Sequence, residues 1–132
     1  STGAPLLRVL PAEPYTSADI DYKSDCRANR EQDSVTDRPA LDASVPDVSG
    51  YDTIYLGYPI WWGKVPRVML TLLENVDLSG KTVIPFCTSG SSSISGSLDE
   101  VHAAAPSTNW QDGQRFDSGV SQADIDSWVA SF

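Results

Sequence analysis

The chain is poor in the residues that build metal sites and disulfide frameworks. Its 132 residues include two cysteines and one histidine. Cys26 and Cys87 form no C-x-x-C pair and His102 stands alone, so the sequence predicts neither a zinc site nor a disulfide scaffold. A chain of this length can bury a hydrophobic core without such cross-links. We therefore expect one domain over residues 1–132 and no metal.

Basic residues and long apolar runs are also scarce. Lys and Arg number 9 against 18 Asp and Glu, which gives a formal net charge of -9. Nucleic acids and anionic membranes are poor partners for such a chain, because both attract basic surfaces. No apolar run approaches the roughly 18 residues of a membrane span, and no signal-peptide pattern is present. We expect a cytoplasmic protein, the alternative being an exported protein whose signal has been removed.

The first 50 residues contain little periodicity. Residues 4–10 predict a short strand, which Pro11 and Pro14 end because proline lacks the backbone donor. A short helix is predicted over residues 17–23. The rest of residues 15–50 is predicted to be a long surface connection, and connections of that length are often functional.

Apolar residues in the rest of the chain alternate between strand-like and helix-like spacing. They predict a strand at 51–57, a helix at 65–73, a strand at 82–87, a helix at 98–105 capped by Ser95 or Ser97, strand residues on either side of an Asp112–Gly113 turn, and a last helix capped by Ser121. This order predicts an α/β fold with an open parallel sheet and helices on both faces. Pro85 argues against a fully paired strand at 82–87.

Two loops that follow predicted strands are unusual for plain connections. The loop at 58–63 carries adjacent indoles, Trp61 and Trp62, which cannot both point into one core, so at least one is expected to be exposed. The loop at 88–95 offers small side chains, hydroxyls and backbone N–H groups at a helix start. Ligands of open parallel sheets bind at the carboxyl ends of the strands. An aromatic plane beside free amide donors suits a planar ring with polar edges, such as a flavin.

These segments resemble a flavodoxin-like family. Residues 51–63, ending in Y-P-I-W-W-G, are similar to the third strand and following loop of that family, and residues 81–92, containing C-T-S-G-S-S, to its fourth strand and flavin-edge loop. Residues 11–16 and 27–32 match as well. The resemblance implies a flavodoxin fold that binds FMN non-covalently. It also implies contacts to the flavin from Pro59, Ile60, Trp61, Trp62 and Gly63 in one loop and from Thr88, Ser89, Gly90 and Ser91 in the other.

The sequence departs from the family at its start. The family begins with a hydrophobic strand, a phosphate-binding loop and a helix, whereas residues 4–14 already match its second strand and the exit from it. Residues 1–3 are interpreted as the turn after the family's first helix or as residues left by cloning. Without the central first strand, we expect either that residues 4–10 move into its place and give a four-stranded sheet, or that two chains close the gap as a homodimer or strand-exchanged assembly.

The resemblance implies an FMN-dependent redox protein that carries electrons or reduces quinones or other small electrophiles. The flavin would do the chemistry, so no catalytic side chain is expected, and FMN binding is expected to be weakened or to depend on another segment. The alternative is a non-catalytic flavodoxin-like domain that binds no flavin and acts through oligomerisation or protein interaction. His102 lacks a G-x-S-x-G partner motif and is expected to face solvent.

Acidic residues recur in the first third of the chain. They allow two interpretations, a solvated face or, by the resemblance, a docking surface for a redox partner with a basic surface. The residues are Asp19, Asp21, Asp25, Asp33 and Asp37.

Overall fold

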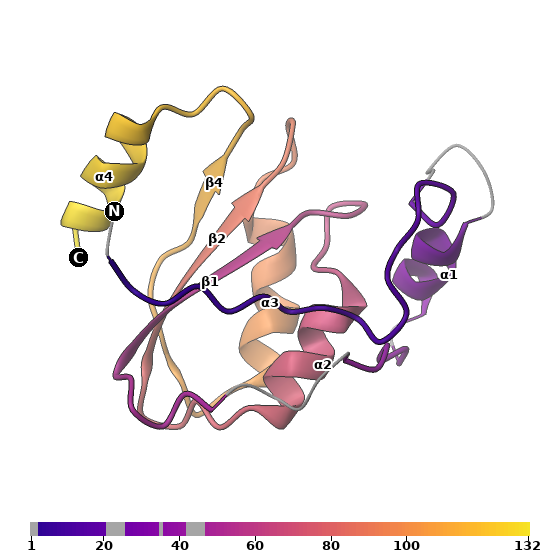
Figure 1. The fold of residues 1–132 in the computed structure, drawn as a ribbon, viewed down its shortest axis with the longest axis horizontal. Helices are drawn as coiled ribbons and strands as arrows, with labels where there is room; N and C mark the ends of the chain where they lie inside the picture. Colours follow the sequence, from indigo (N-terminus) through magenta and orange to yellow (C-terminus); the bar gives the residue numbers. More distant parts are fainter. Residues whose placement is uncertain (1–2, 21–25, 35, 42–46) are drawn as a thin grey trace.

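The computed structural model describes residues 3–20, 26–34, 36–41 and 47–132. Its described strands form one parallel sheet, in which β2 (Thr82–Thr88) pairs with β1 (Thr53–Pro59) on one side and with β3 (Asn109–Trp110) and β4 (Gln114–Phe116) on the other. The helices are α1 (Arg27–Asp33), α2 (Arg67–Asn75), α3 (Ser95–Ala104) and α4 (Gln122–Ala130). Figure 1 shows α2 and α3 on one face of the sheet and α4 on the other, as the sequence predicted.

Side chains along β1 and β2 point alternately to the two faces of the sheet, and apolar residues lie on both faces. Leu56 and Tyr58 point into the same core as Val83 and Cys87, together with buried residues of α2 and α3. Tyr55 and Phe86 belong to the other face, where both contact Trp128 of α4. Because successive strand side chains point to opposite faces, a strand that is apolar at every position is stable only with cover on both sides.

β2 pairs on one side with two short strands, β3 and β4, and the gap between them lies beside Pro85. β3 and β4 both run parallel to β2, so Asp112–Gly113 does not reverse the chain, and the predicted turn is instead a break within one edge row. β3 pairs with Thr82 and Val83, and β4 begins opposite Phe86. Proline offers no N–H to a neighbour, so the central strand tolerates Pro85 where its partner is interrupted.

The N-terminal segment contradicts the sequence prediction. No strand is assigned to residues 4–10 in the described structure, and the sheet reaches four strands through β3 and β4 instead. The segment crosses in front of β1 (Figure 1) and leaves Leu6 87% exposed. Val9 packs against the hydrophobic core, and just after the segment an isolated antiparallel bridge joins Pro11 to Leu41. Residues 4–10 therefore do not fill the central position, and β1 is the edge of the described sheet.

Residues 15–50 contain more structure than expected. Thr16 and Asp19 bond each other's backbone N–H through their side chains and close one turn at 17–20, while residues 21–23 of the expected helix lie outside the described part. α1 was missed because its cap is a cysteine: the Sγ of Cys26 accepts from the N–H of Asn29 at 3.4 Å. Cys26 itself is buried.

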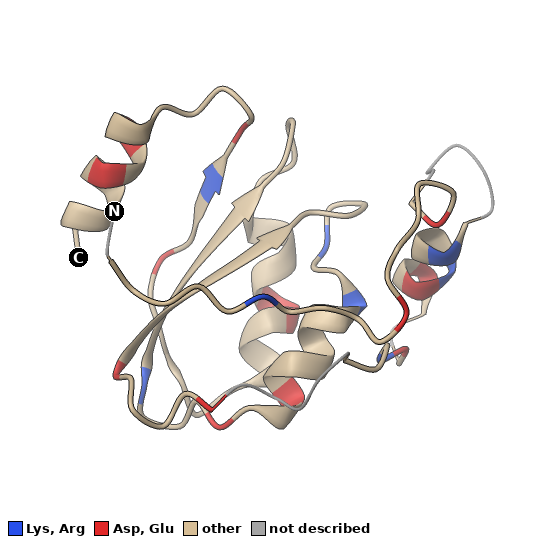
Figure 2. Ribbon diagram, in the orientation of Figure 1, with Lys and Arg blue, Asp and Glu red and all other residues tan. Residues whose placement is uncertain are grey.

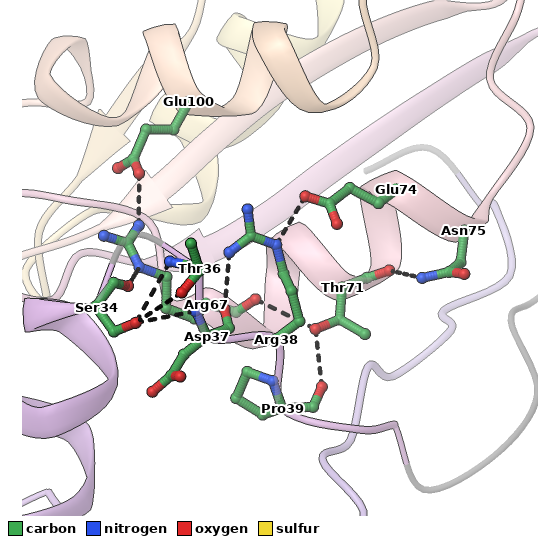
Figure 3. Close-up of polar contacts among 10 residues, drawn as sticks. All are labelled: Ser34, Thr36, Asp37, Arg38, Pro39, Arg67, Thr71, Glu74, Asn75 and Glu100. Atoms are coloured by element: carbon green, nitrogen blue, oxygen red, sulfur yellow. Dashed lines mark hydrogen bonds and ion pairs between the residues drawn. The ribbon is translucent and has the colours of Figure 1, made fainter.

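A fully buried arginine anchors the chain that follows α1 (Figure 3). Arg67 donates to the carbonyl oxygens of Ser34 (2.9 Å) and Gln32 (3.2 Å) and forms an ion pair with Glu100 of α3 (2.6 Å). Thr71 adds a bond to the carbonyl of Pro39 at 2.8 Å. These contacts tie the segment after α1 to α2 and α3.

The two C-terminal helices begin differently. Ser121 caps α4 as predicted, accepting from the N–H of Asp124 at 3.1 Å. α3 instead begins at Ser95 with Ile94 at its cap position, so neither Ser95 nor Ser97 caps it. No described helix is long and apolar enough to span a membrane.

Candidate functional site

The loop after β1, residues 60–64, folds back on itself at the carboxyl edge of the sheet. Trp61 and Lys64 exchange two backbone hydrogen bonds, 2.9 and 3.0 Å long. Trp62 and Gly63 bridge the turn with φ of 52° and 75°. A positive φ strains the backbone of a bulky residue such as Trp62, whereas glycine adopts it without a steric penalty. We name residues 60–64 the tryptophan loop.

The two indoles of this loop have different surroundings. Trp61 is partly buried, and its ring meets the ring of Tyr15 edge-on with 5.0 Å between centroids. Trp62 stands at 84° to Trp61 and keeps 45% of its surface exposed. As the sequence predicted, one indole is exposed.

The tryptophan loop is supported by residues that the sequence had placed in a long surface connection. The buried side chain of Gln32 donates to the carbonyl oxygens of Trp61 (3.0 Å) and Val65 (3.2 Å). The backbone carbonyl of Gln32 in turn accepts a hydrogen bond from Arg67. Two buried polar residues, one at the end of α1 and one at the start of α2, thus fix the backbone of the loop. No motif pointed to this pair in the sequence, because their partners are backbone atoms far along the chain.

Tyr15 belongs to a compact polar cluster behind Trp61. Its hydroxyl donates to Glu31 at 2.5 Å, and Arg27 pairs with the same carboxylate at 2.7 Å. The Arg27 guanidinium also lies 4.1 Å from the centroid of the Tyr15 ring, within reach of a cation–π contact. Burial, reinforced by the bond to Glu31, raises the pKa of Tyr15 above its usual value of 10. Tyr15 therefore remains a neutral donor and a fixed support for Trp61.

The loop after β2, residues 88–92, is the second half of the site, and we name it the serine loop. The N–H of Ser89 donates to the carbonyl of Phe116 at 3.1 Å, and its hydroxyl donates to the carbonyl of Ser92. In the described part of the chain, the N–H groups of Gly90 and Ser91 have no hydrogen-bond acceptor. A Cβ added at Gly90 would meet no protein atom within 4 Å. The loop thus offers amide donors in an open position.

The two loops are held side by side by direct contacts. The N–H of Ile60 donates to the carbonyl of Thr88 at 3.2 Å. A Cβ on Gly96, in the first turn of α3, would lie 2.7 Å from the carbonyl oxygen of Gly63, so only glycine permits this approach without a shift. The nine residues that the sequence assigned to the site are therefore adjacent at the carboxyl edge of β1 and β2.

Two further residues with reactive side chains are His102, which lies on α3, and Cys87, which directly precedes Thr88 at the end of β2. His102 is on α3, with its ring 5.0 Å from that of Trp110, a residue that pairs with the start of β2. The Nε2 atom of His102 is buried and has no partner among the described residues, so the expected solvent-facing position is wrong. Cys87 is fully buried, and that burial raises the pKa of its thiol, which favours an inert core residue.

The arrangement fits a flat ring with polar edges. β1 and β2 contain no charged residue, and the charge next to the serine loop is that of Arg115 on the adjacent strand β4 (Figure 2). The exposed indole of Trp62 can stack on a ring face, and the free N–H groups of Gly90 and Ser91 can bond ring oxygens or nitrogens. Among the described residues, no group of three His, Cys, Asp or Glu side chains could hold a metal ion.

Comparisons with known proteins agree with this geometry. The family model described as flavodoxin matches residues 1–132. A protein from Bacteroides uniformis ATCC 8492, classed as a flavoprotein, has 41% identity and a TM-score of 0.87, with 92% of this chain and 78% of that chain covered. A similarly classed protein from Bacteroides eggerthii DSM 20697 has 37% identity and a TM-score of 0.83, with 92% and 77% covered.

A more distant structure shares the fold. The flavoprotein from Lactobacillus acidophilus NCFM, solved in complex with FMN, has 23% identity and a TM-score of 0.56, with 77% of this chain and 65% of that chain covered. The comparison with curated proteins found no match. The family model over the whole chain and the relative with 41% identity give the same assignment: this chain belongs to the flavodoxin family.

Proposed function

We propose that this chain is a flavodoxin-like redox protein that binds FMN between the tryptophan loop and the serine loop. The observation that carries the proposal is the exposed indole of Trp62, 45% accessible, beside the unbonded N–H groups of Gly90 and Ser91. A stacking plane and amide donors on adjacent loops are what an isoalloxazine ring needs. The FMN complex of the Lactobacillus acidophilus flavoprotein, which has the same fold, is consistent with this ligand.

The residues of the site would bind and orient the flavin. Trp62 would cover one face of the ring and exclude water from it, with Trp61 and Tyr15 as its support. Gly90 and Ser91 would donate their N–H groups to the polar edge of the ring. The flavin itself supplies the transfer of electrons or hydride, so no side chain has to act as acid or base. We propose quinones and similar small electrophiles, or a partner protein with a basic surface, as acceptors.

FMN binding by the 132-residue chain is expected to be weak. The described residues would hold the ring through two loops, but none forms a loop that opens a helix next to the free edge of β1, where this fold binds the FMN phosphate. The phosphate would therefore contribute little affinity. Riboflavin, which lacks the phosphate, should bind almost as well as FMN.

The test is a flavin titration of matched aromatic variants. Trp62→Ala should weaken FMN binding by about 1–3 kcal/mol, the usual contribution of aromatic stacking on a base-like ring. Tyr51→Ala is the control, because Tyr51 is 42% exposed but lies at the other end of β1. Equal affinity of the two variants would show that the site is misplaced. Reoxidation of the reduced, flavin-loaded chain by a quinone then tests the redox role.

A second candidate function follows from the free edge of β1. An apolar groove of about 390 Å³ runs along this edge, lined by residues that include Leu6, Leu7, Tyr55 and Val129. We infer that a second copy of the chain can cover it. If the chain binds no flavin, it would then be a non-catalytic domain that acts through self-association. A purified chain that is dimeric by light scattering, colourless and indifferent to added FMN would favour this function over the first.

A further inference from the structure

The side chain of Arg115 forms hydrogen bonds with the serine loop. It lies on β4 opposite Cys87 of β2. Its Nε donates to the hydroxyl of Ser89 at 3.0 Å, and its NH2 group donates to the carbonyl of Gly90 at 2.8 Å. With the backbone bond from Ser89 to Phe116, β4 makes three hydrogen bonds to two consecutive residues of the loop. Gly90 is thereby held through its carbonyl while its N–H remains free.

The charge of Arg115 has acidic neighbours but no ion-pair partner among the described residues, since Asp117 and Asp124 line the same pocket without pairing with it. No carboxylate in the described part of the chain forms an ion pair with it, whereas Arg27, Arg38 and Arg67 each pair with a glutamate. Both of its hydrogen bonds go to neutral oxygens. The side chain is partly buried, so solvent screens its charge less than that of a fully exposed cation. A positive charge thus stands beside the loop whose amides face the site, in a chain with a net charge of -9.

We propose that Arg115 positions the serine loop and makes the site prefer a ligand ring that carries negative charge. This inference rests on the proposed flavin site. Reduced flavin bears a negative charge near neutral pH, and oxidised flavin is neutral, so Arg115 attracts the reduced form more strongly. A site that binds the reduced form more tightly raises the reduction potential of the bound flavin. The acidic composition alone would suggest the opposite direction.

Two variants separate the positioning role from the charge. Arg115→Lys keeps the charge and loses the planar fork that bonds two oxygens at once. Arg115→Gln keeps an amide donor and loses the charge. Lys81→Gln is the control, because it removes the same charge at the amino end of β2, where Lys81 bonds the carbonyl of Tyr51 at 2.6 Å.

The first measurement needs no flavin. Hydrogen exchange of the Ser89 amide, which donates to the carbonyl of Phe116 at 3.1 Å, should speed up about tenfold in both Arg115 variants of the free chain and remain unchanged in the Lys81 control. Unchanged exchange in Arg115→Lys and Arg115→Gln would overturn the positioning role.

The second measurement compares the dissociation constants of oxidised and reduced FMN under argon. Arg115→Gln should weaken binding of reduced FMN about tenfold more than binding of oxidised FMN, which corresponds to a potential about 30 mV lower for the two-electron couple. Arg115→Lys should weaken both forms by similar factors. An unchanged ratio in Arg115→Gln, while the wild type binds FMN, would overturn the charge role alone. A wild type that binds neither form would overturn the proposed function, and the charge role with it.

Discussion

The helices α2 and α4 are both nine residues long and lie on opposite faces of the same sheet (Figure 1), yet they are packed very differently. Six residues of α2 are buried, including Leu73 at 2% exposure, whereas no residue of α4 is. α4 instead rests on the sheet mainly through Trp128, whose ring contacts those of Tyr55, Phe86 and Phe116.

This difference shows which half of the molecule is complete in itself. The face under α2 and α3 is a closed core, and it carries both loops of the site on its strand and helix ends. The face under α4 is open beside the N-terminal segment, where the apolar groove lies. The positions of the tryptophan loop and the serine loop therefore depend on the closed face, and the self-association that we propose would use the open one.

The largest expected effect is on the free energy of unfolding, and it should differ between variants of α2 and α4. Leu73→Ala should lower the free energy of unfolding by about 2–5 kcal/mol, because it leaves a cavity in the closed core. Ile125→Ala on α4 removes a half-buried side chain and should cost about 1 kcal/mol. Urea denaturation followed by tryptophan fluorescence measures both. Similar losses in the two variants would contradict the contrast between the faces.

Two glycines of the site distinguish a contact within the protein from a contact with the ligand. Gly96→Ala should destabilise the free chain by about 1–3 kcal/mol, because its Cβ would press on the carbonyl of Gly63. Gly90→Val should leave thermal stability almost unchanged, since nothing lies within 4 Å of a Cβ there. It should nevertheless lower FMN affinity, because the new side chain stands where the ring edge would approach. Differential scanning calorimetry and FMN titration of both variants decide the point.

Self-association through the open face should weaken when a charge is placed on the edge strand β1. Light scattering of the 14.2 kDa chain is expected to show a dimer that weakens on dilution. Thr53→Lys places a charge on exposed β1 and should raise the dimer dissociation constant about tenfold, or about 1.4 kcal/mol. Ser79→Lys adds the same charge at an exposed turn away from the edge and should change nothing. A chain that is monomeric at all concentrations would refute this association.

The smallest expected effect is on the pH dependence of folding stability, and it arises from Tyr58 in the core of the closed face. Burial raises the pKa of Tyr58 above its usual value of 10, although its bond to Ser97, 2.9 Å long, acts in the opposite direction. The folded chain then holds this proton more tightly than the unfolded chain, so the stability from Tyr58 is complete below pH 10 and is lost as pH rises above it. Ultraviolet titration of Tyr58→Phe should lack part of the alkaline phenolate absorbance seen in the wild type. A wild-type protein whose stability does not fall above pH 10 would argue against this assignment.

The contrast between the two halves also marks where sequence reasoning succeeded. The strands and helices from residue 51 onward were predicted to within a few residues, because apolar periodicity there is strong and local. The two loops of the site were found for a related reason: adjacent indoles and a run of small polar residues each follow a buried strand. The approach of Gly96 to Gly63 left no such signal, because it joins the backbones of distant segments.

Failures concentrate in the first 50 residues. The apolar run at 4–10 predicted a strand, but a strand needs a partner, and the segment lies across β1 without pairing in the sheet. α1 was missed because a cysteine caps it and because its buried face includes Glu31 and Gln32, which look like surface residues in a sequence. Their burial is compensated by bonds to Arg27, one helical turn away, and to Tyr15 and the tryptophan loop, which are both distant in the sequence.

The sequence by itself determined the fold class, the parallel sheet and the position of the two loops that we propose as the site, because these follow from periodicity and from residue types that stand next to one another in the chain. The nine flavin contacts within those loops were implied by the family resemblance and remain a prediction. Tertiary structure alone decided that Trp62 is exposed and Trp61 supported, that Gln32 and Arg67 hold one loop and Arg115 the other, and that β1 remains an edge. The physical reason is that each of these outcomes depends on a hydrogen bond or a packing contact between segments far apart in the sequence, and such contacts form only when the chain folds.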